Sequence, residues 1–367
     1  QLPSKSLQLA RYQRDVEMNR ELFTMLRRRY EEAKINEAAQ AANIQVVDAA
    51  VAPRRPAKPN VKLNLILGLV VGGGFGVGLA YLREMIDNTV RTPEEVERMG
   101  FRLLGTVPQI NEKNLEDNIR IRGNGFPGKE IRKIQRRLVT HFDPKSPISE
   151  AYRIFHTNLH YITPDSPVKS ILVSSAGPGE GKSTTASNLA ITSARMGNKT
   201  LLVDLDLRRP MVHKIFNVQE SPGMSELLVR KKKLGEVVRS TGIENLSVIT
   251  GGHLPPNPTE LVGSEALKDV LRSLSDQFDR IIIDSPPIVA VADSLMLSVE
   301  VTDTVLVVSS GDTVRGVLKK ARQQIEDVGG NLAGALLNKV KPTDLYGSSY
   351  YHYHEYFSYS SRSSKSE

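Results

Sequence analysis

The stretch AGPGEGKS, residues 176–183, decides the fold that this sequence predicts. It follows the apolar run 171–173 and precedes a helical pattern over 184–196. Glycines let backbone N–H groups close around phosphate oxygens, and the N-terminus of the following helix adds positive potential. The spacing is that of a phosphate-binding P-loop, with alanine in place of the usual first glycine. The residues expected to bind a nucleotide are Ala176, Gly177, Gly179, Glu180, Gly181, Lys182, Ser183 and Thr184.

Two further apolar runs end in carboxylates. Asp204 and Asp206 follow residues 201–203, and Asp284 follows residues 281–283. The carboxyl ends of parallel strands converge on one ligand crevice, so these side chains are expected beside the P-loop. We expect a catalytic set of Lys182, Asp204, Asp206 and Asp284, with Mg²⁺ held by Ser183, Asp204 and Asp284 and one carboxylate acting as base toward an incoming hydroxyl.

The order of apolar and amphipathic segments predicts the fold class. Short apolar runs without polar alternation are separated by helical patterns, which is typical of a mostly parallel sheet covered by helices on both faces. The runs cover 171–173, 201–203, 246–249, 281–283, 305–308 and 335–337, and the helical patterns cover 184–196, 260–278 and 314–328. The sequence therefore predicts an α/β P-loop nucleotide-binding fold.

The composition excludes several functions. The chain of 367 residues contains no cysteine, which rules out disulfides, thiolate metal sites, cysteine-ligated iron–sulfur clusters and a cysteine nucleophile. Lys and Arg total 49 against 41 Asp and Glu, a formal net charge of +8. This mild excess suits contact with phosphates or acidic surfaces, so we expect no nucleic-acid partner.

An uncharged segment interrupts this soluble pattern. Residues 63–82 carry no charge, and twenty helical residues at ~1.5 Å each span a hydrocarbon core of ~30 Å, so we predict a transmembrane helix there. Residues 1–45 show apolar side chains at coiled-coil spacing and are expected to form a helix, and residues 46–62 form a proline-rich juxtamembrane segment. Residues 83–145 are expected to be a linker with one short helix, and residues 146–340 the nucleotide-binding domain.

The C-terminal segment, residues 341–367, loses the α/β pattern and is rich in tyrosine and serine. Next to a nucleotide-binding domain this cluster is interpreted as a set of phosphate acceptors, although a disordered tail or an aromatic assembly segment would have the same composition. The expected acceptors are Tyr346, Tyr350, Tyr351, Tyr353, Tyr356 and Tyr359.

Taken together, these motifs resemble the bacterial tyrosine kinases, the Wzc-like polysaccharide co-polymerases that regulate chain length in capsule and exopolysaccharide export. The resemblance rests on AGPGEGKST, DLDLRRP, IIIDSPP, the run SPISEAYRIFHTNL at 146–159 and the tyrosine cluster. It extends to VVDAAVAPRRPAKPN before the apolar segment and PEEVERMGFRLLGTVP after it. The chain looks like the C-terminal portion of such a protein.

The resemblance assigns roles to individual residues. Lys182 and Ser183 would belong to the Walker A motif, Asp204 and Asp206 to the additional A′ motif, and Asp284 to Walker B. Glu150 and Arg153 match the start of the family's self-assembly motif, in which His156 stands where the family has a third charged residue. We also expect Arg208 and Asn338 to contact the nucleotide. GTP is disfavoured because no aspartate follows Asn338-Lys339 to complete a guanine-reading pattern.

The resemblance also implies a function. The chain would be a membrane-anchored, non-specific protein-tyrosine kinase that uses ATP and Mg²⁺ to phosphorylate its own tyrosine cluster in trans. It would regulate polysaccharide polymerisation and export through assembly and disassembly of a homo-oligomeric ring. The implied partners are the membrane, the polysaccharide polymerase, the outer-membrane export machinery and a cognate tyrosine phosphatase.

The expected location is the bacterial inner membrane. Four basic residues on each side of residues 63–82 leave the orientation undecided by charge. Because ATP is cytoplasmic, the kinase domain is expected on that side and the N-terminal helix in the periplasm.

Two alternatives stay open. A non-catalytic scaffold could use ATP binding only to stabilise an oligomer. A partitioning ATPase of the MinD or ParA type would share the fold, but it carries a second lysine early in the P-loop, where this chain has Gly177.

Overall fold

The computed structural model describes residues 2–41, 58–110, 137–162 and 168–341. The chain divides into two compact units, Gln1–Leu82 and Arg83–Glu367, which are considered separately. The predicted phosphate acceptors and most of the proline-rich segment lie outside the described residues.

The first unit contains helix α1 and most of helix α2. Helix α1 spans Leu2–Ala41, and the apolar side chains of its predicted seam, such as Phe23 and Leu26, are exposed. Helix α2, Val61–Ile86, contains the predicted membrane segment. Among the described residues it is the one helix whose length and apolar composition suffice to cross a bilayer, and its side chains are not buried against protein.

The second unit is built on an eight-stranded sheet with the strand order β1-β8-β7-β2-β6-β3-β5-β4. All neighbouring strands are parallel except β4 and β5. This sheet confirms the predicted α/β fold. The strands are β1 (Leu103–Pro108), β2 (Ser170–Ser175), β3 (Thr200–Asp204), β4 (Arg239–Ser240), β5 (Leu246–Ile249), β6 (Arg280–Asp284), β7 (Asp303–Ser309) and β8 (Leu332–Val340).

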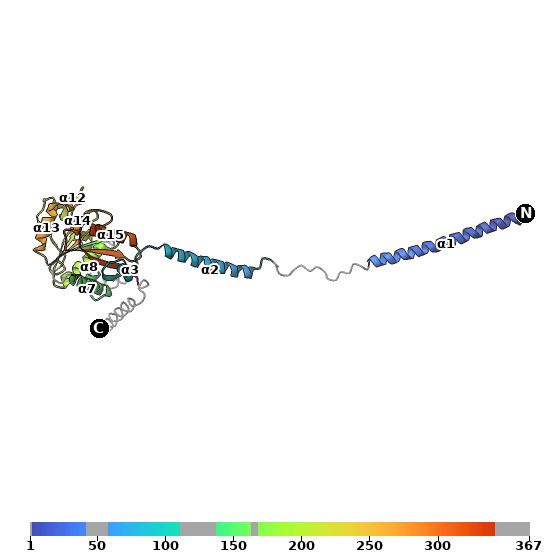
Figure 1. The fold of residues 1–367 in the computed structure, drawn as a ribbon, viewed down its shortest axis with the longest axis horizontal. Coiled ribbons are helices and arrows are strands. Elements are labelled where there is room, and N and C mark those ends of the chain that lie inside the picture. Colours follow the sequence, from blue (N-terminus) through green and yellow to red (C-terminus); the bar gives the residue numbers. More distant parts are fainter. Residues whose placement is uncertain (1, 42–57, 111–136, 163–167, 342–367) are drawn as a thin grey trace, which may run out of the picture. The chain divides into compact units, whose positions relative to one another are not determined.

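Helices cover both faces of the sheet (Figure 1), which explains why its strands are apolar without alternation. Ile171, Val173 and Ile282 pack into one core with residues of α7 and α8. Their chain neighbours Leu172 and Ile283 pack into a second core on the other face, with residues of α13. The helices of this unit are α3 (Pro93–Arg98), α6 (Val139–Phe142), α7 (Pro147–His160), α8 (Lys182–Arg195), α9 (Val212–Phe216), α10 (Met224–Leu228), α11 (Leu234–Val237), α12 (Pro258–Val262), α13 (Glu265–Ser275), α14 (Asp293–Ser298) and α15 (Arg315–Asp327).

The structure differs from two expectations about segment boundaries. The predicted linker contains the expected short helix, α3, but it also contains β1, which pairs with β8 as an edge strand of the sheet. Leu104 and Val107 of β1 are fully buried, so this part of the linker is core. The helical pattern at 260–278 forms two helices, because Ser264 caps α13 by accepting a hydrogen bond from the backbone of Leu267.

Candidate active site

The P-loop connects the end of β2 to the start of α8. Gly179 and Gly181 have φ angles of +79° and +99°, in the left-handed region that favours glycine. A Cβ atom on Gly181 would also collide with the side chain of Asn338. The amide Nδ2 of Asn338 donates to the carbonyl of Glu180 at 2.9 Å. Asn338 therefore holds the P-loop backbone from β8, whereas the sequence suggested a contact with the nucleotide.

Lys182, Asp206 and Asp284 come together at the carboxyl edge of the sheet. The Lys182 Nζ donates to Asp206 Oδ2 at 2.7 Å and lies 3.7 Å from Asp284 Oδ1. Burial lowers the pKa of Lys182, but the charges of Asp284 and Asp206 outweigh it and hold that pKa above its ordinary value. The lysine is thus charged and poised beside the P-loop.

Asp284 ends β6 and is fully buried. Neither of its carboxyl oxygens has a hydrogen-bond partner within the described part of the chain. Burial raises the pKa of Asp284. The charge of Lys182 and the hydroxyl of Ser183 lower it, but the pKa stays above its ordinary value. Buried carboxylate oxygens that lack hydrogen-bond partners and lie near a hydroxyl fit a hard cation such as Mg²⁺, which is held in proteins by one or two carboxylates together with phosphate oxygens.

Asp204 lies beside this group, but its oxygens face the backbone. Its Oδ2 accepts hydrogen bonds from the N–H groups of Met211 and Val212, both at 2.9 Å, at the start of α9. Its Oδ1 accepts from the N–H of Asp206 at 3.2 Å. Burial, together with the charge of Asp284, raises its pKa. The described residues contain no group of three or more acidic or histidine side chains arranged to hold a metal. The geometry thus favours Ser183 and Asp284 over Asp204 as metal ligands.

Arg208 is engaged away from the P-loop. Its Nε lies 2.9 Å from Asp293 Oδ2 on α14, and its Nη2 donates to the Thr259 hydroxyl at 2.7 Å. Thr259 donates in turn to Asp293 Oδ1 at 2.7 Å. This network fastens the loop after β3 to α12 and α14.

Glu180 makes a contact that the sequence did not predict. Its Oε2 accepts from the N–H of Ala176 at 3.0 Å, and its Oε1 accepts from the Thr313 hydroxyl at 2.7 Å. Burial raises the pKa of Glu180 from 4.5 to about 6. Thr313 lies 133 residues away, between β7 and α15, and nothing in the local sequence marks it.

The loop that carries Thr313 is held by the segment that follows Asp87. The N–H of Val90 donates to the Thr313 carbonyl, and the N–H of Gly311 donates to the Val90 carbonyl, both at 2.8 Å. The N–H of Arg315 donates to the Asn88 carbonyl at 2.9 Å. Residues 88–90 are therefore connected through Thr313 to the P-loop.

The predicted self-assembly residues lie on α7. Arg153 forms an ion pair with Glu150 of the same chain, and both side chains are partly exposed. His156 is buried, and burial lowers its pKa to about 4, so its ring is neutral at neutral pH.

The chain is similar to known proteins along much of its length. A family model described as the G-rich domain on putative tyrosine kinase matches residues 4–85, and an AAA domain model matches residues 168–325. The kinase domain of the tyrosine kinase ETK of Escherichia coli, a solved structure, is 30% identical with a TM-score of 0.62, covering 68% of this chain and 95% of that one.

Two curated relatives show the extent of the similarity. Tyrosine-protein kinase YwqD of Bacillus subtilis (strain 168) is 39% identical over 209 residues, which cover 57% of this chain and 88% of the relative. Tyrosine-protein kinase etk of Escherichia coli (strain K12) is 31% identical over 341 residues, 92% of this chain but 47% of the relative. The chain thus spans about half the length of the latter.

Proposed function

The chain belongs to the family of bacterial tyrosine-protein kinases, and on that premise we propose that it transfers the γ-phosphate of ATP to the tyrosines of its own C-terminal cluster. The observation that carries the proposal is the group formed by Lys182, Asp206 and Asp284 beside the P-loop. A lysine shared by two carboxylates can neutralise the phosphates of a bound nucleotide, while a carboxylate remains to accept a proton.

The residues suggest how the transfer proceeds. Lys182 turns from Asp206 to the β- and γ-phosphates when ATP enters, which frees the Asp206 carboxylate. A tyrosine hydroxyl then forms a bond to the γ-phosphorus, the bond from that phosphorus to the bridging oxygen breaks, and ADP leaves. Asp206 accepts the tyrosine proton. Mg²⁺, held by Ser183 and Asp284, would neutralise charge on the phosphate oxygens.

We infer that the transfer occurs in trans within a homo-oligomeric ring. Each phosphate adds ~1.5 to 2 negative charges to a tail, so repulsion among phosphorylated tails and the acidic site would loosen the assembly. This cycle would regulate polysaccharide polymerisation and export. The apolar helix α2 supports anchoring in a membrane. We infer that this is the bacterial inner membrane and, because ATP is cytoplasmic, that the kinase domain lies on the cytoplasmic side.

Loss of one lysine tests the transfer. Purified full chain in detergent is incubated with Mg·ATP, and phosphotyrosine is followed over time. The rate is expected to fall at least ~100-fold in Lys182→Met, since this change removes a charged phosphate contact. It should be unchanged in the matched variant Lys319→Met, whose lysine is exposed on α15. Equal phosphotyrosine in wild type and Lys182→Met would refute the proposal.

A mixing experiment tests the trans step. One variant carries Lys182→Met with an intact cluster, and the other has active-site residues intact with all six cluster tyrosines changed to phenylalanine. Phosphotyrosine in the mixture, but in neither variant alone, is the expected result. If phosphotyrosine appears only where an active site and acceptors share one chain, the trans mechanism is wrong although the kinase assignment stands.

A further inference from the structure

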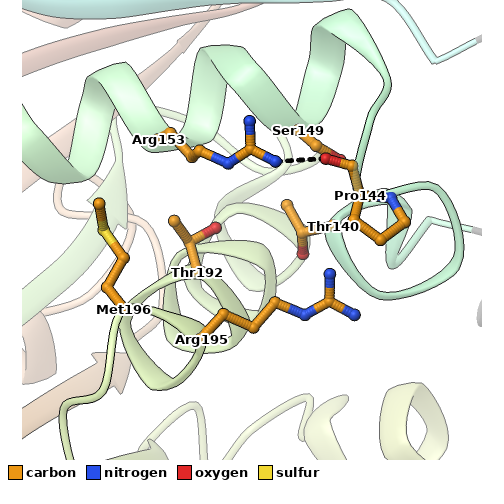
Figure 2. A pocket seen from close by; sticks show the side chains of 7 residues that line it. All are labelled: Thr140, Pro144, Ser149, Arg153, Thr192, Arg195 and Met196. Carbon is orange, nitrogen blue, oxygen red and sulfur yellow. Dashed lines mark hydrogen bonds between the residues drawn. The ribbon is translucent and has the colours of Figure 1, made fainter.

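A cavity lies among helices α6, α7 and α8, and no residue of the P-loop lines it. It has a volume of about 340 Å³. Figure 2 shows Arg153 of α7 and Arg195 of α8 extending their guanidinium groups along this cavity from different helices. The lining residues are Thr140, Pro144, Ser149, Arg153, Thr192, Arg195 and Met196.

The charges around the cavity are mainly positive. Burial lowers the pKa of Arg195, and the positive charge of Arg153 lowers it further. Each guanidinium group therefore lies in the repulsive field of the other. Glu150 forms an ion pair with Arg153 and offsets part of this charge. An anion placed between the two guanidinium groups would relieve the remaining repulsion.

The hydroxyl groups of the lining donate to other parts of the protein. Thr140 Oγ1 donates to Asn188 Oδ1 and Thr192 Oγ1 donates to the Asn188 carbonyl, both at 2.8 Å. Ser149 Oγ donates to the Asp143 carbonyl at 2.6 Å. The wall is thereby fixed, and the donors left for a ligand are guanidinium N–H groups.

Both guanidinium groups have more N–H donors than their contacts within the protein use. Arg153 donates to Glu150 and to the Pro144 carbonyl, and Arg195 Nη2 donates to the His141 carbonyl at 3.2 Å. A guanidinium group carries five N–H donors in a planar fork, so both arginines retain donors beyond these contacts. Carbonyl contacts also restrict their positions, which lowers the entropy lost on binding a ligand.

We propose that this cavity is a binding site for a phosphomonoester dianion, held between the guanidinium groups of Arg153 and Arg195. The two guanidinium groups attract the dianion although Glu150 offsets part of their charge, and the arginine fork matches the geometry of phosphate oxygens. The volume also accommodates an organic group attached to the phosphate. The ligand is either free phosphate or a phosphorylated side chain, such as the phosphotyrosine that the proposed function would produce.

Titration with two probes tests the site. Full chain in detergent is saturated with Mg·ADP to fill the P-loop, and phenyl phosphate or inorganic phosphate is added in a calorimeter. We expect saturable binding of one equivalent. Binding should weaken by about 10- to 100-fold in both Arg153→Gln and Arg195→Gln, because each removes a charge-assisted contact. The matched control Arg272→Gln, an exposed arginine of α13, should bind as wild type does.

Glu150→Gln supplies a test of opposite sign. Removing this carboxylate frees Arg153, so phosphate binding should tighten several-fold instead of weakening. If thermal unfolding shows that a glutamine variant is not folded, Arg195→Lys replaces it. This variant keeps the positive charge but loses the planar guanidinium group, so it should still weaken phosphate binding. Tighter binding of phenyl phosphate than of inorganic phosphate identifies an ester as the ligand, and equal binding identifies free phosphate.

Several results would overturn the site. One is the absence of saturable binding, and another is equal affinity in wild type and both glutamine variants. A change of oligomeric state in these variants, without phosphate binding to the wild type, would instead make the cavity an interface between copies of the chain. None of these measurements requires phosphoryl transfer, so a failed kinase proposal would leave the result interpretable.

Discussion

The burial of Glu180 in the P-loop predicts a pH dependence of stability that one substitution should remove. Glu180 is 5% exposed, and burial raises its pKa from 4.5 to about 6. The folded state therefore binds the proton of this carboxyl more tightly than the unfolded state. Its contribution to stability is fully present below pH 4.5 and is lost as the pH rises through about 6.

The size of this loss follows from the pKa difference. The difference of 6 − 4.5 = 1.5 units corresponds to about 2 kcal/mol at ~1.4 kcal/mol per unit. Glu180→Gln is neutral at every pH and should lack this loss. The free energy of unfolding of the variant, relative to wild type, should thus rise by about 1.5 kcal/mol between pH 4.5 and pH 6.5, which is most of the full difference.

Urea unfolding of the full chain, followed by circular dichroism at a series of pH values, measures this difference. Other carboxylates titrate in the same range, including Asp303, whose pKa burial raises to about 6. They are common to both proteins and cancel in the comparison. Glu244→Gln, at an exposed glutamate, serves as the matched control and should show a flat difference. A flat difference for Glu180→Gln, or one that falls with pH, would refute the reasoning.

Three further substitutions test the contacts around the site. Thr313→Val removes the hydroxyl that donates to Glu180 and should lower the free energy of unfolding by about 1–3 kcal/mol. Thr313→Ser keeps a hydroxyl and should retain most of that free energy. Equal losses of unfolding free energy in the two variants, measured by urea unfolding, would contradict this prediction. Asp204→Ala removes the acceptor of the N–H groups of Met211 and Val212 at the start of α9, and of Asp206, and should cost about 2–4 kcal/mol. Asp204→Asn keeps an acceptor and should cost less than half as much. The reverse order in urea unfolding would argue against the capping role. Gly181→Ala places a Cβ atom on a residue with a φ of +99° and against the side chain of Asn338, so ADP affinity and the free energy of unfolding should both fall. The control Gly316→Ala, in α15, should leave ADP binding unchanged in calorimetry.

Much of the fold could be predicted because the strands are buried on both faces. Continuous apolar runs such as 281–283 and 305–308 indicate strands that are covered on both faces of a sheet. The helical patterns between these runs indicate helices that connect parallel strands. The P-loop and the strand-end aspartates then identify one edge of the sheet as the nucleotide site. These features depend on local sequence, and the structure places them together.

Contacts between distant segments could not be predicted in this way. The pairing of β1 with β8 joins residues more than 200 positions apart, across a basic stretch that suggested a linker. Asp204 and Asp206 look equivalent in the sequence, but the start of α9 occupies the oxygens of Asp204 only, while Asp206 pairs with Lys182. Nothing in the local sequence distinguishes Thr313 from other loop residues, and its contact with Glu180 exists only in the folded chain.

The most direct test of the account is to map phosphate by mass spectrometry on the purified chain after incubation with Mg·ATP. We predict phosphate on tyrosines between residues 346 and 359 in wild type, and none there in Lys182→Met. Phosphate at the same positions and level in Lys182→Met, or wild-type phosphate confined to serines of residues 341–367, would contradict the assignment of this site as a tyrosine kinase.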